Sequence, residues 1–375
     1  MIYLDNAATS RFKPKCALDA LLFDVSHSAN SGRGSHDEAV DKSIRIQKCR
    51  DYLLSMLGAS EEYSLVFTKN CTEALNLAVF GLINGGEKVV TSTNEHNSVL
   101  RPLYKLKSEG KISLDVIKAD RSGHIRLEDV EKCAKYADIM VFGGACNVTG
   151  AVCDIDEIAN ICKKNNVKLI VDGAQSVPII PLNLKNSGIS MLACPGHKGL
   201  HGIQGTGFLI VKNDVSLKPL LYGGTGTFSN EVLPKAAMPE SFEAGTQFSG
   251  GICALHLGAK WTFDNLAKIQ KHINRITKNV IYSLEHVGAT LYTRDEKTGV
   301  VCFNLKNADS GYVADKLNEA GICVRGGLHC APLVHLNMGT TNQGAVRASV
   351  GCDTQESEIN YFLSCVERIF KDVTK

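Results

Sequence analysis

The sequence lacks an excess of charge of either sign, a long apolar run and a signal-peptide pattern. Its 375 residues include 41 Lys and Arg against 39 Asp and Glu, a net charge of +2. This balance creates no field that attracts nucleic acid or anionic lipid, so we expect neither as a partner. The uncharged stretch Gly326–Val346 is rich in Gly, His, Asn and Thr, which argues against a membrane span. The opening residues MIYLDNAATS have neither a basic nor an apolar region, so we expect a cytoplasmic protein.

The sequence also lacks any CxxC pair, although it contains 14 Cys. Scattered cysteines in a chain of this size are typical of reduced, mostly buried thiols in a cytosolic protein. Gly199 and Gly202 argue against a helix that would pair His197 with His201 as metal ligands. We therefore expect no metal site.

Strand-like and helix-like segments alternate from about residue 64 to residue 211. Short runs that are apolar on both faces lie at 64–68, 88–92, 113–117, 138–142, 168–172 and 207–211. Such runs, separated by helical patterns, predict a parallel sheet covered by helices on both faces. After about Gly251 a long helical stretch, from Cys253 to about His286, leads to short strands and helices. We expect a large domain over residues 15–255 and a small α+β domain over residues 256–375.

Ligands of such sheets bind at the carboxyl ends of the strands, so the residues after each run are the candidates for a binding site. A helix that begins near Cys71, capped by Asn70, offers free N–H groups that bind phosphate, although an ordinary capped turn is the simpler explanation. His96 either stacks on a planar ligand or caps a helix. Asn147 either faces a ligand or forms a turn.

Two further segments are more informative. Asp172 ends a buried strand, where a carboxylate is unfavourable unless it is paired. A cationic ring nitrogen is a suitable partner, and Gln175 can bind the same ligand; the alternative is a helix-capping Asp. Lys198 lies in a Gly-rich loop between apolar strands, which suits a lysine that forms a Schiff base, because its partner needs a close backbone approach.

The C-terminal part contributes two more candidates. Cys330 follows a strand on a Gly-rich loop beside His329, a setting in which a thiol is more often reactive than structural. Arg347 stands among small residues and can form a fork around a substrate carboxylate; the alternative is a surface or ion-paired arginine.

Together these motifs resemble those of the cysteine desulfurases of the class V aminotransferase superfamily. The resemblance covers nearly the whole chain, through YLDNAAT (3–9), FTKNCTEALNLA, EHNSV, VDGAQSVP, GHKG, FEAGT (242–246), RGGLHCAP and RASVG. The pattern RGxxHCA is similar to the group II branch, the Suf-type and selenocysteine-lyase-like enzymes. The resemblance implies the α/β fold of fold type I transferases that depend on pyridoxal 5′-phosphate (PLP). In that fold a mainly parallel seven-stranded sheet forms the large domain, and residues 1–14 complete the small one.

The resemblance also implies PLP as cofactor, L-cysteine as substrate, a homodimer and a sulfur-acceptor protein as partner. Lys198 matches the lysine that binds the cofactor covalently, and Cys330 matches the nucleophile that accepts sulfur. The other matches are the ring-nitrogen partner Asp172, the ring-hydroxyl partner Gln175, the stacking His96, the phosphate ligands Cys71 (through its backbone), Thr72 and His197, the phosphate ligand of the neighbouring subunit Thr246, and the substrate-carboxylate ligands Asn147 and Arg347.

Two positions depart from the family pattern. Pro195 stands where the family usually has a Ser or Thr phosphate ligand, and Asn70-Cys71-Thr72 stands where Suf-type enzymes have Gly-Thr-Thr. Proline offers neither a hydroxyl nor an N–H group, so phosphate binding must depend on Thr72, His197 and the backbone.

Three alternatives remain open. The first is a selenocysteine lyase, and the second is a class V aminotransferase or β-lyase in which Cys330 is incidental. The third is a sulfur-trafficking or regulatory protein without catalysis, which the presence of Lys198 and Asp172 disfavours.

Overall fold

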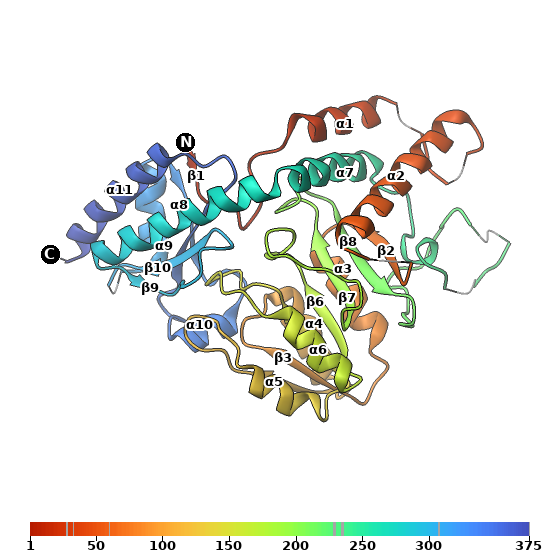
Figure 1. Cartoon of the computed structure of the whole chain (residues 1–375), viewed down its shortest axis with the longest axis horizontal. Coiled ribbons are helices and arrows are strands. Elements are labelled where there is room, and N and C mark those ends of the chain that lie inside the picture. The colour runs from red at the N-terminus through yellow and green to blue at the C-terminus, as the bar shows by residue number, and fades with distance from the viewer. Residues whose placement is uncertain are drawn as a thin grey trace.

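A seven-stranded sheet forms the centre of this computed structural model (Figure 1), which describes residues 1–27, 29–32, 34–59, 61–227, 230–233, 236–306 and 308–374. The strand order is β2-β8-β7-β6-β5-β3-β4, and β8 runs antiparallel to both neighbours while the other pairs are parallel. The strands are β2 (Tyr63–Thr68), β3 (Glu87–Ser92), β4 (Ile112–Ile117), β5 (Ile139–Gly143), β6 (Lys168–Asp172), β7 (Ile189–Pro195) and β8 (Gly207–Lys212). The predicted α/β fold with a mainly parallel seven-stranded sheet is confirmed.

Helices cover both faces of this sheet. Leu169 and Val171 on β6 pack among side chains of one helical layer, whereas Ile170 between them packs into the other. The first layer contains α2 (Asp37–Met56), α5 (Leu127–Ala134), α6 (Ile155–Lys164) and α7 (Ser249–Asp264); the second contains α3 (Cys71–Leu82) and α4 (Asn97–Ser108). Helix α1 (Lys15–Ser26) packs on α7, and a short 3-10 helix spans Glu240–Phe242. A strand buried on both faces must be apolar throughout, which is why these strands appear as continuous apolar runs in the sequence.

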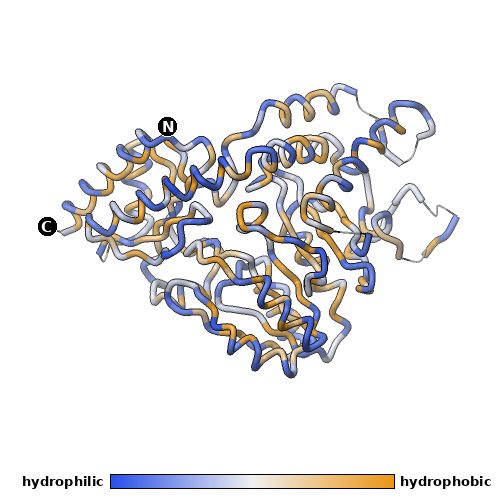
Figure 2. The backbone as a smooth tube through the Cα atoms, viewed as in Figure 1, coloured by the Kyte–Doolittle hydropathy of each residue, from blue (hydrophilic) through white to orange (hydrophobic). Residues whose placement is uncertain are grey.

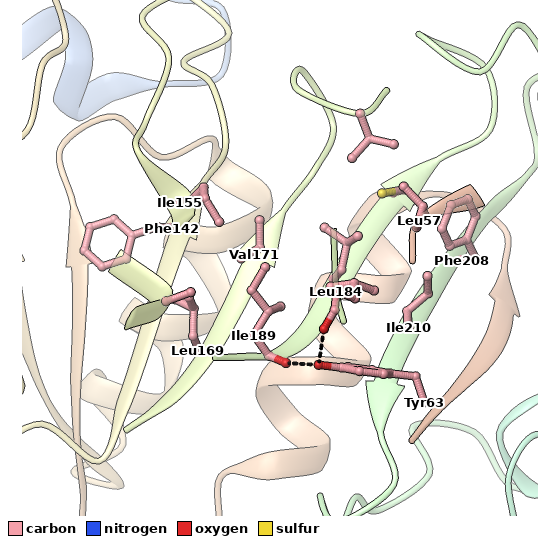
Figure 3. Close-up of a cluster of buried hydrophobic side chains, with 14 of the residues drawn as sticks. Leu57, Tyr63, Phe142, Ile155, Leu169, Val171, Leu184, Ile189, Phe208 and Ile210 are labelled. Atoms are coloured by element: carbon pink, nitrogen blue, oxygen red, sulfur yellow. Dashed lines mark hydrogen bonds between the residues drawn. The ribbon is translucent and has the colours of Figure 1, made fainter. Parts of the chain in front are cut away.

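Figure 3 shows part of the core in the first layer. There the Tyr63 hydroxyl lies 3.3 Å from the backbone oxygen of Leu184 and 3.0 Å from that of Ile189. Its polar atom is therefore satisfied inside an otherwise apolar cluster. Figure 2 shows hydrophobic residues along the central strands and alternating polarity along the outer helices, as expected for amphipathic helices on a sheet.

A second, four-stranded sheet lies in the C-terminal part, with the order β12-β13-β10-β9. Its strands are β9 (Thr290–Leu291), β10 (Val300–Asn304), β12 (Arg325–Gly327) and β13 (Ala345–Ser349), and its helices are α8 (Leu266–Val287), α9 (Ser310–Glu319), α10 (Pro332–Met338) and α11 (Glu356–Thr374). Strand β1 (Ile2–Tyr3) pairs in parallel with β11 (Ile322–Cys323), so the N-terminal segment lies against the C-terminal part. The boundary expected between residues 255 and 256 falls inside α7, and the division into two domains stays a prediction.

The single long helix expected from Cys253 to His286 is wrong, because the structure has two helices that meet at Asn265. The Asn265 side chain donates a hydrogen bond to the backbone oxygen of Trp261, at 2.8 Å. A side-chain amide that binds the carbonyl four residues earlier competes with the helix and favours its termination there. In the described part of the chain, no helix is long and apolar enough to cross a membrane.

Candidate active site

A cavity of about 110 Å³ lies at the carboxyl ends of the parallel strands. This is where open α/β sheets bind ligands. Most of the predicted site residues line it: Cys71, Thr72, His96, Asn147, Asp172, Gln175, His197 and Lys198. Cys330, Arg347 and Thr246 do not line it and are described below.

Asp172 lies at the end of β6 on the cavity wall and is largely buried. Its Oδ1 accepts hydrogen bonds from the Ala174 N–H group, at 2.9 Å, and from the Cys71 thiol, at 3.5 Å. Burial and the nearby Asp172 raise the pKa of Cys71 well above its usual range, so Cys71 stays a thiol and a donor. Among the described residues no donor reaches the other oxygen, Oδ2, which is therefore available to a cationic group of a ligand.

Lys198 follows β7 in the Gly-rich loop that leads to β8. The glycines allow close packing: a Cβ atom on Gly199 would lie 2.5 Å from the Val177 backbone oxygen, and one on Gly196 would lie 2.2 Å from the Thr206 hydroxyl. Burial lowers the pKa of Lys198, and Asp172 partly opposes this effect. A lowered pKa increases the share of neutral amine, the form that reacts with a carbonyl.

The phosphate end of the predicted site lies at the start of α3. Asn70 caps this helix, because its side-chain oxygen accepts a hydrogen bond from the Glu73 N–H group at 2.9 Å. The N–H groups of Cys71 and Thr72 are left without an intrahelical partner. The Thr72 hydroxyl lies 2.8 Å from that of Ser98, another cavity residue. Ser98 was not singled out in the sequence, and it brings a second hydroxyl to the end of the cavity where Pro195 offers none.

Both histidines of the predicted site have fixed ring partners. The His96 Nδ1 atom accepts a hydrogen bond from the Ser98 N–H group at 3.0 Å, so His96 caps α4 and lines the cavity at the same time. The His197 Nδ1 atom lies 3.0 Å from the Thr9 hydroxyl. Burial, with Lys198 and Lys13 nearby, lowers the pKa of His197 to about 4. His197 is therefore a neutral hydrogen-bonding group at neutral pH.

Cys330 is exposed, and the backbone of its loop is bound to Asn147, on the cavity wall, and to Asn97, which lies between two cavity residues. Its carbonyl accepts a hydrogen bond from the Asn97 N–H group at 2.7 Å, and the preceding carbonyl, of His329, accepts one from the Asn147 side chain at 2.8 Å. His329 and Cys330 have φ angles of 50° and 56°, in the left-handed region. Such strain is held by surrounding bonds and is typical of functional loops.

The ring of His329 also ties this loop down. Its Nε2 atom lies 3.2 Å from the Arg325 backbone oxygen, and its Nδ1 atom lies 3.3 Å from the Nε2 atom of buried His335. Arg325 in turn places a guanidinium nitrogen 3.6 Å from the Cys330 sulfur. The thiol therefore stands on a short, anchored loop with a positive charge beside it. Arg325 was not predicted, although it is the first residue of the RGxxHCA pattern.

Arg347 is buried behind Asn147 and is already paired. Its guanidinium donates to Asp5 Oδ1 at 2.8 Å and to the Asn147 backbone oxygen at 3.0 Å, while its Nε atom has no partner among the described residues. In this structure Arg347 is therefore an ion-paired arginine, which was the alternative expected from the sequence. Its predicted role as a ligand of the substrate carboxylate stays a prediction.

Thr246 lies outside the cavity, in a separate hollow beside β2 and the start of α7. Its segment is fixed by buried Glu243, which pairs with Arg50 at 2.8 Å and accepts a hydrogen bond from the Phe67 N–H group at 2.6 Å. Thr246 itself is exposed, and its role toward a neighbouring subunit stays a prediction.

Comparison with known proteins identifies relatives that match nearly the whole chain. The model of the family "Aminotransferase class-V" matches residues 2–362. A probable cysteine desulfurase of Pyrococcus abyssi is 32% identical over 100% of this chain and 95% of its own length, and one of Methanothermobacter thermautotrophicus is 33% identical over 98% and 94%. The apo structure of a cysteine desulfurase from Thermococcus onnurineus NA1 is similar with a TM-score of 0.91 and 30% identity, over 99% of this chain and 95% of that one. The chain belongs to the class-V aminotransferase family.

Proposed function

We propose that the chain is a PLP-dependent cysteine desulfurase of the group II type, which converts L-cysteine to L-alanine and keeps the sulfur on Cys330 as a persulfide. The observation that carries this proposal is the exposed Cys330 thiol, whose loop is bound through Asn97 and Asn147 to the cavity that holds Lys198 and Asp172. The names of the relatives, cysteine desulfurases, support the same activity.

The residues of the cavity fit PLP, the cofactor of this family. Two buried polar atoms on its wall, Glu95 Oε2 and Asn147 Oδ1, lack partners among the described residues, as expected where a polar ligand belongs. The start of α3, with Thr72, Ser98 and His197, suits a phosphate group. Asp172 Oδ2 suits a protonated ring nitrogen, and His96 and Gln175 line the space between.

The chemistry that PLP supplies when bound is an electron sink for the Cα–H bond of an amino acid joined to it. Lys198 would hold the cofactor covalently, and its Nζ atom, once free, would take the Cα proton as general base. Asp172 keeps the ring nitrogen protonated, which makes the sink effective. Asn147 and Arg347 bind the substrate carboxylate and so fix which bond is presented to Lys198.

Cys330 then receives the sulfur. Its thiolate forms a bond to the substrate sulfur, the bond between that sulfur and Cβ breaks, and the electron pair stays with Cβ. One proton then adds to Cβ, and Lys198 returns one to Cα. The products are alanine and the Cys330 persulfide, so no external oxidant is needed. The Arg325 guanidinium, 3.6 Å from the Cys330 sulfur, stabilises negative charge there before and after the transfer.

The proposed reaction is tested by assaying the PLP-reconstituted protein with L-cysteine. We expect alanine as the organic product, with sulfide released when a small thiol removes the sulfur from the protein. Pyruvate and ammonia as products would support a β-lyase, and a keto acid that retains the thiol would support an aminotransferase.

Asp172→Asn is expected to keep PLP bound and to lower turnover by on the order of a hundredfold, because the ring nitrogen loses its charge partner. The amide still accepts the Ala174 hydrogen bond, so the local fold is preserved. PLP content and alanine production of the variant are measured together. A near-normal rate with full cofactor would contradict the role of Asp172.

The enzyme is expected to be a homodimer. Exposed apolar side chains lie on α1, on α2 and on the segment between β8 and α7; they are Leu18, Leu22, Phe23, Val40, Ile44, Leu220, Leu221, Tyr222, Val232, Leu233 and Phe248. Leu221 and Phe248 also line the hollow of Thr246. Figure 1 places α2 and this segment at the end of the molecule opposite the two termini. Apolar groups on this scale are typical of an interface, and a dimer buries them while bringing Thr246 to the partner's cavity.

Light scattering at micromolar concentration is expected to give twice the mass of one chain. Leu22→Glu is expected to shift the protein toward monomer and to reduce PLP retention, whereas Tyr282→Glu, on exposed α8, is expected to leave the dimer intact. A fully active monomer would contradict the dimer.

The persulfide also needs an acceptor. The Cys330 loop is short and anchored, so the sulfur cannot travel far, and we expect a dedicated acceptor protein to come to it. We place the enzyme in the cytoplasm, where its 14 thiols are expected to stay reduced.

A further inference from the structure

Glu95 is a buried carboxyl group that the mechanism above does not use. It precedes His96, at the turn between β3 and α4, lines the cavity and is only 1% exposed. Its Oε1 atom accepts a hydrogen bond from the Ser92 hydroxyl at 2.5 Å, and Ser92 in turn accepts one from the Asn94 N–H group at 3.1 Å. Its Oε2 atom has no partner among the described residues. A buried carboxyl oxygen without a partner is unfavourable unless a ligand supplies one.

The surroundings of Glu95 favour the protonated form. Burial, with the negative charge of Asp172 on the neighbouring wall, raises the pKa of Glu95 to about 8, although the Ser92 hydroxyl and the Gly143 backbone N–H group oppose this shift. No lysine or arginine within the described residues forms an ion pair with it. Because Oε1 already accepts the Ser92 hydrogen bond, the proton belongs on Oε2. Oε2 is then a hydrogen-bond donor on the wall of the cavity.

We propose that Glu95 acts as a neutral carboxylic acid whose Oε2–H group donates a hydrogen bond to the ligand in this cavity, so that ionisation of Glu95 weakens ligand binding. This inference rests on the proposed function in taking PLP as that ligand. It adds to the site a residue that binds as an uncharged donor, where a second carboxylate beside Asp172 would be expected to repel the anionic cofactor.

The other ionisable groups around Glu95 do not replace it in this role. Cys146 and Cys153, which follow β5, are thiols whose pKa values are raised by burial and by Glu95 itself. His96 is kept neutral because burial lowers its pKa. Asp172 and Lys198 are the other charged groups on the cavity wall, and both are retained in the Glu95 variants.

The protonation state is tested on the apo-protein with Glu95→Gln, which imitates the neutral acid. The unfolded chain releases the Glu95 proton near a pKa of about 4.3, whereas the folded protein holds it until about 8, so the wild type loses stability over this interval as pH rises. The unfolding temperature of Glu95→Gln is therefore expected to exceed that of the wild type by a margin that grows from about pH 5 to about pH 8 and is constant above. A margin that does not change with pH would overturn the neutral-acid assignment.

The donor role is tested with pyridoxamine 5′-phosphate, which binds without a covalent bond to Lys198. At about pH 6, the wild type and Glu95→Gln are expected to bind it equally, and the apolar Glu95→Met about tenfold more weakly, because one hydrogen bond is lost. As pH rises through about 8, the affinity of the wild type is expected to fall further than that of Glu95→Gln.

Equal affinity of Glu95→Met and the wild type would overturn the hydrogen bond to the ligand. Parallel pH profiles of the wild type and Glu95→Gln would overturn the effect of ionisation. Neither experiment uses cysteine, so both can succeed in a protein that forms no persulfide. A protein that passes both tests but forms no persulfide would contradict the proposed function, and the role of Glu95 would still be supported.

Discussion

Lys198→Ala is expected to abolish the covalent attachment of PLP and all turnover of L-cysteine. The side chain lines the cavity with Asp172, in a loop that glycines allow to pack closely, and desolvation lowers its pKa, which increases the share of neutral amine. An unperturbed lysine, with a pKa of about 10.4, is neutral in only about four molecules in ten thousand at pH 7. The measurements are the visible absorbance of the reconstituted protein and incorporation of tritium after borohydride reduction.

Lys13 provides the matched control for this substitution. It lies near His197, its amine donates to the His197 backbone oxygen at 3.0 Å, and burial lowers its pKa to about 8. Lys13 is therefore a second amine of altered acidity close to the same loop, but it does not line the cavity. Lys13→Ala is expected to keep the reducible bond to the cofactor. A bond that survives in Lys198→Ala and disappears in Lys13→Ala would show that the wrong lysine was assigned.

Cys330→Ala is expected to lower the desulfuration of L-cysteine by more than about a thousandfold, because the substrate sulfur then has no nucleophile to accept it. Cleavage of L-selenocysteine is expected to persist in part, since a selenol leaves more readily and depends less on a nucleophile. Alanine production from both substrates, measured with equal PLP content, gives the two rates. Full activity of the variant on L-cysteine would make Cys330 incidental.

Cys323→Ala is the control for the loss of a thiol in the same region. Cys323 is partly exposed on β11, a few residues before the Cys330 loop. It lacks the anchoring bonds to Asn97 and Asn147, so its replacement is expected to leave both rates unchanged. A selective loss in Cys330→Ala together with unchanged rates in Cys323→Ala would also separate a chemical role of Cys330 from the general effect of losing a thiol in this region.

The sequence predicted those parts of the fold in which local pattern and burial agree. Strands such as Lys168–Asp172 are apolar on both faces and rich in β-branched residues, and each of the six expected runs lies on a strand. Strand β7, with the sequence ISMLACP, was not among those six runs, because Met, Ala and Cys are weak indicators of a strand. Its helix-facing positions are set by packing between β6 and β8, which sequence pattern does not reveal.

Site residues could be predicted from the sequence where the residue type is unusual for its position. Asp172 at the end of an apolar strand and Lys198 among glycines were such cases, and both line the cavity. Glu95 and Ser98 were missed because each is an ordinary residue for a helix-starting turn, and its importance depends on the cavity beside it. The contact between Arg347 and Asp5 joins residues from opposite ends of the chain, and no local signal indicates such a pairing.

The central claim is that Cys330 receives the sulfur of the substrate, and peptide mass spectrometry tests it most directly. The PLP-reconstituted protein is incubated with L-cysteine without any reducing thiol, alkylated, digested and analysed for peptides that carry one extra sulfur atom. We predict that the extra sulfur lies on the peptide containing Cys330, in an amount equal to the alanine formed in the first turnover. Extra sulfur on a peptide with another cysteine, or alanine formed without any protein-bound sulfur, would contradict the account.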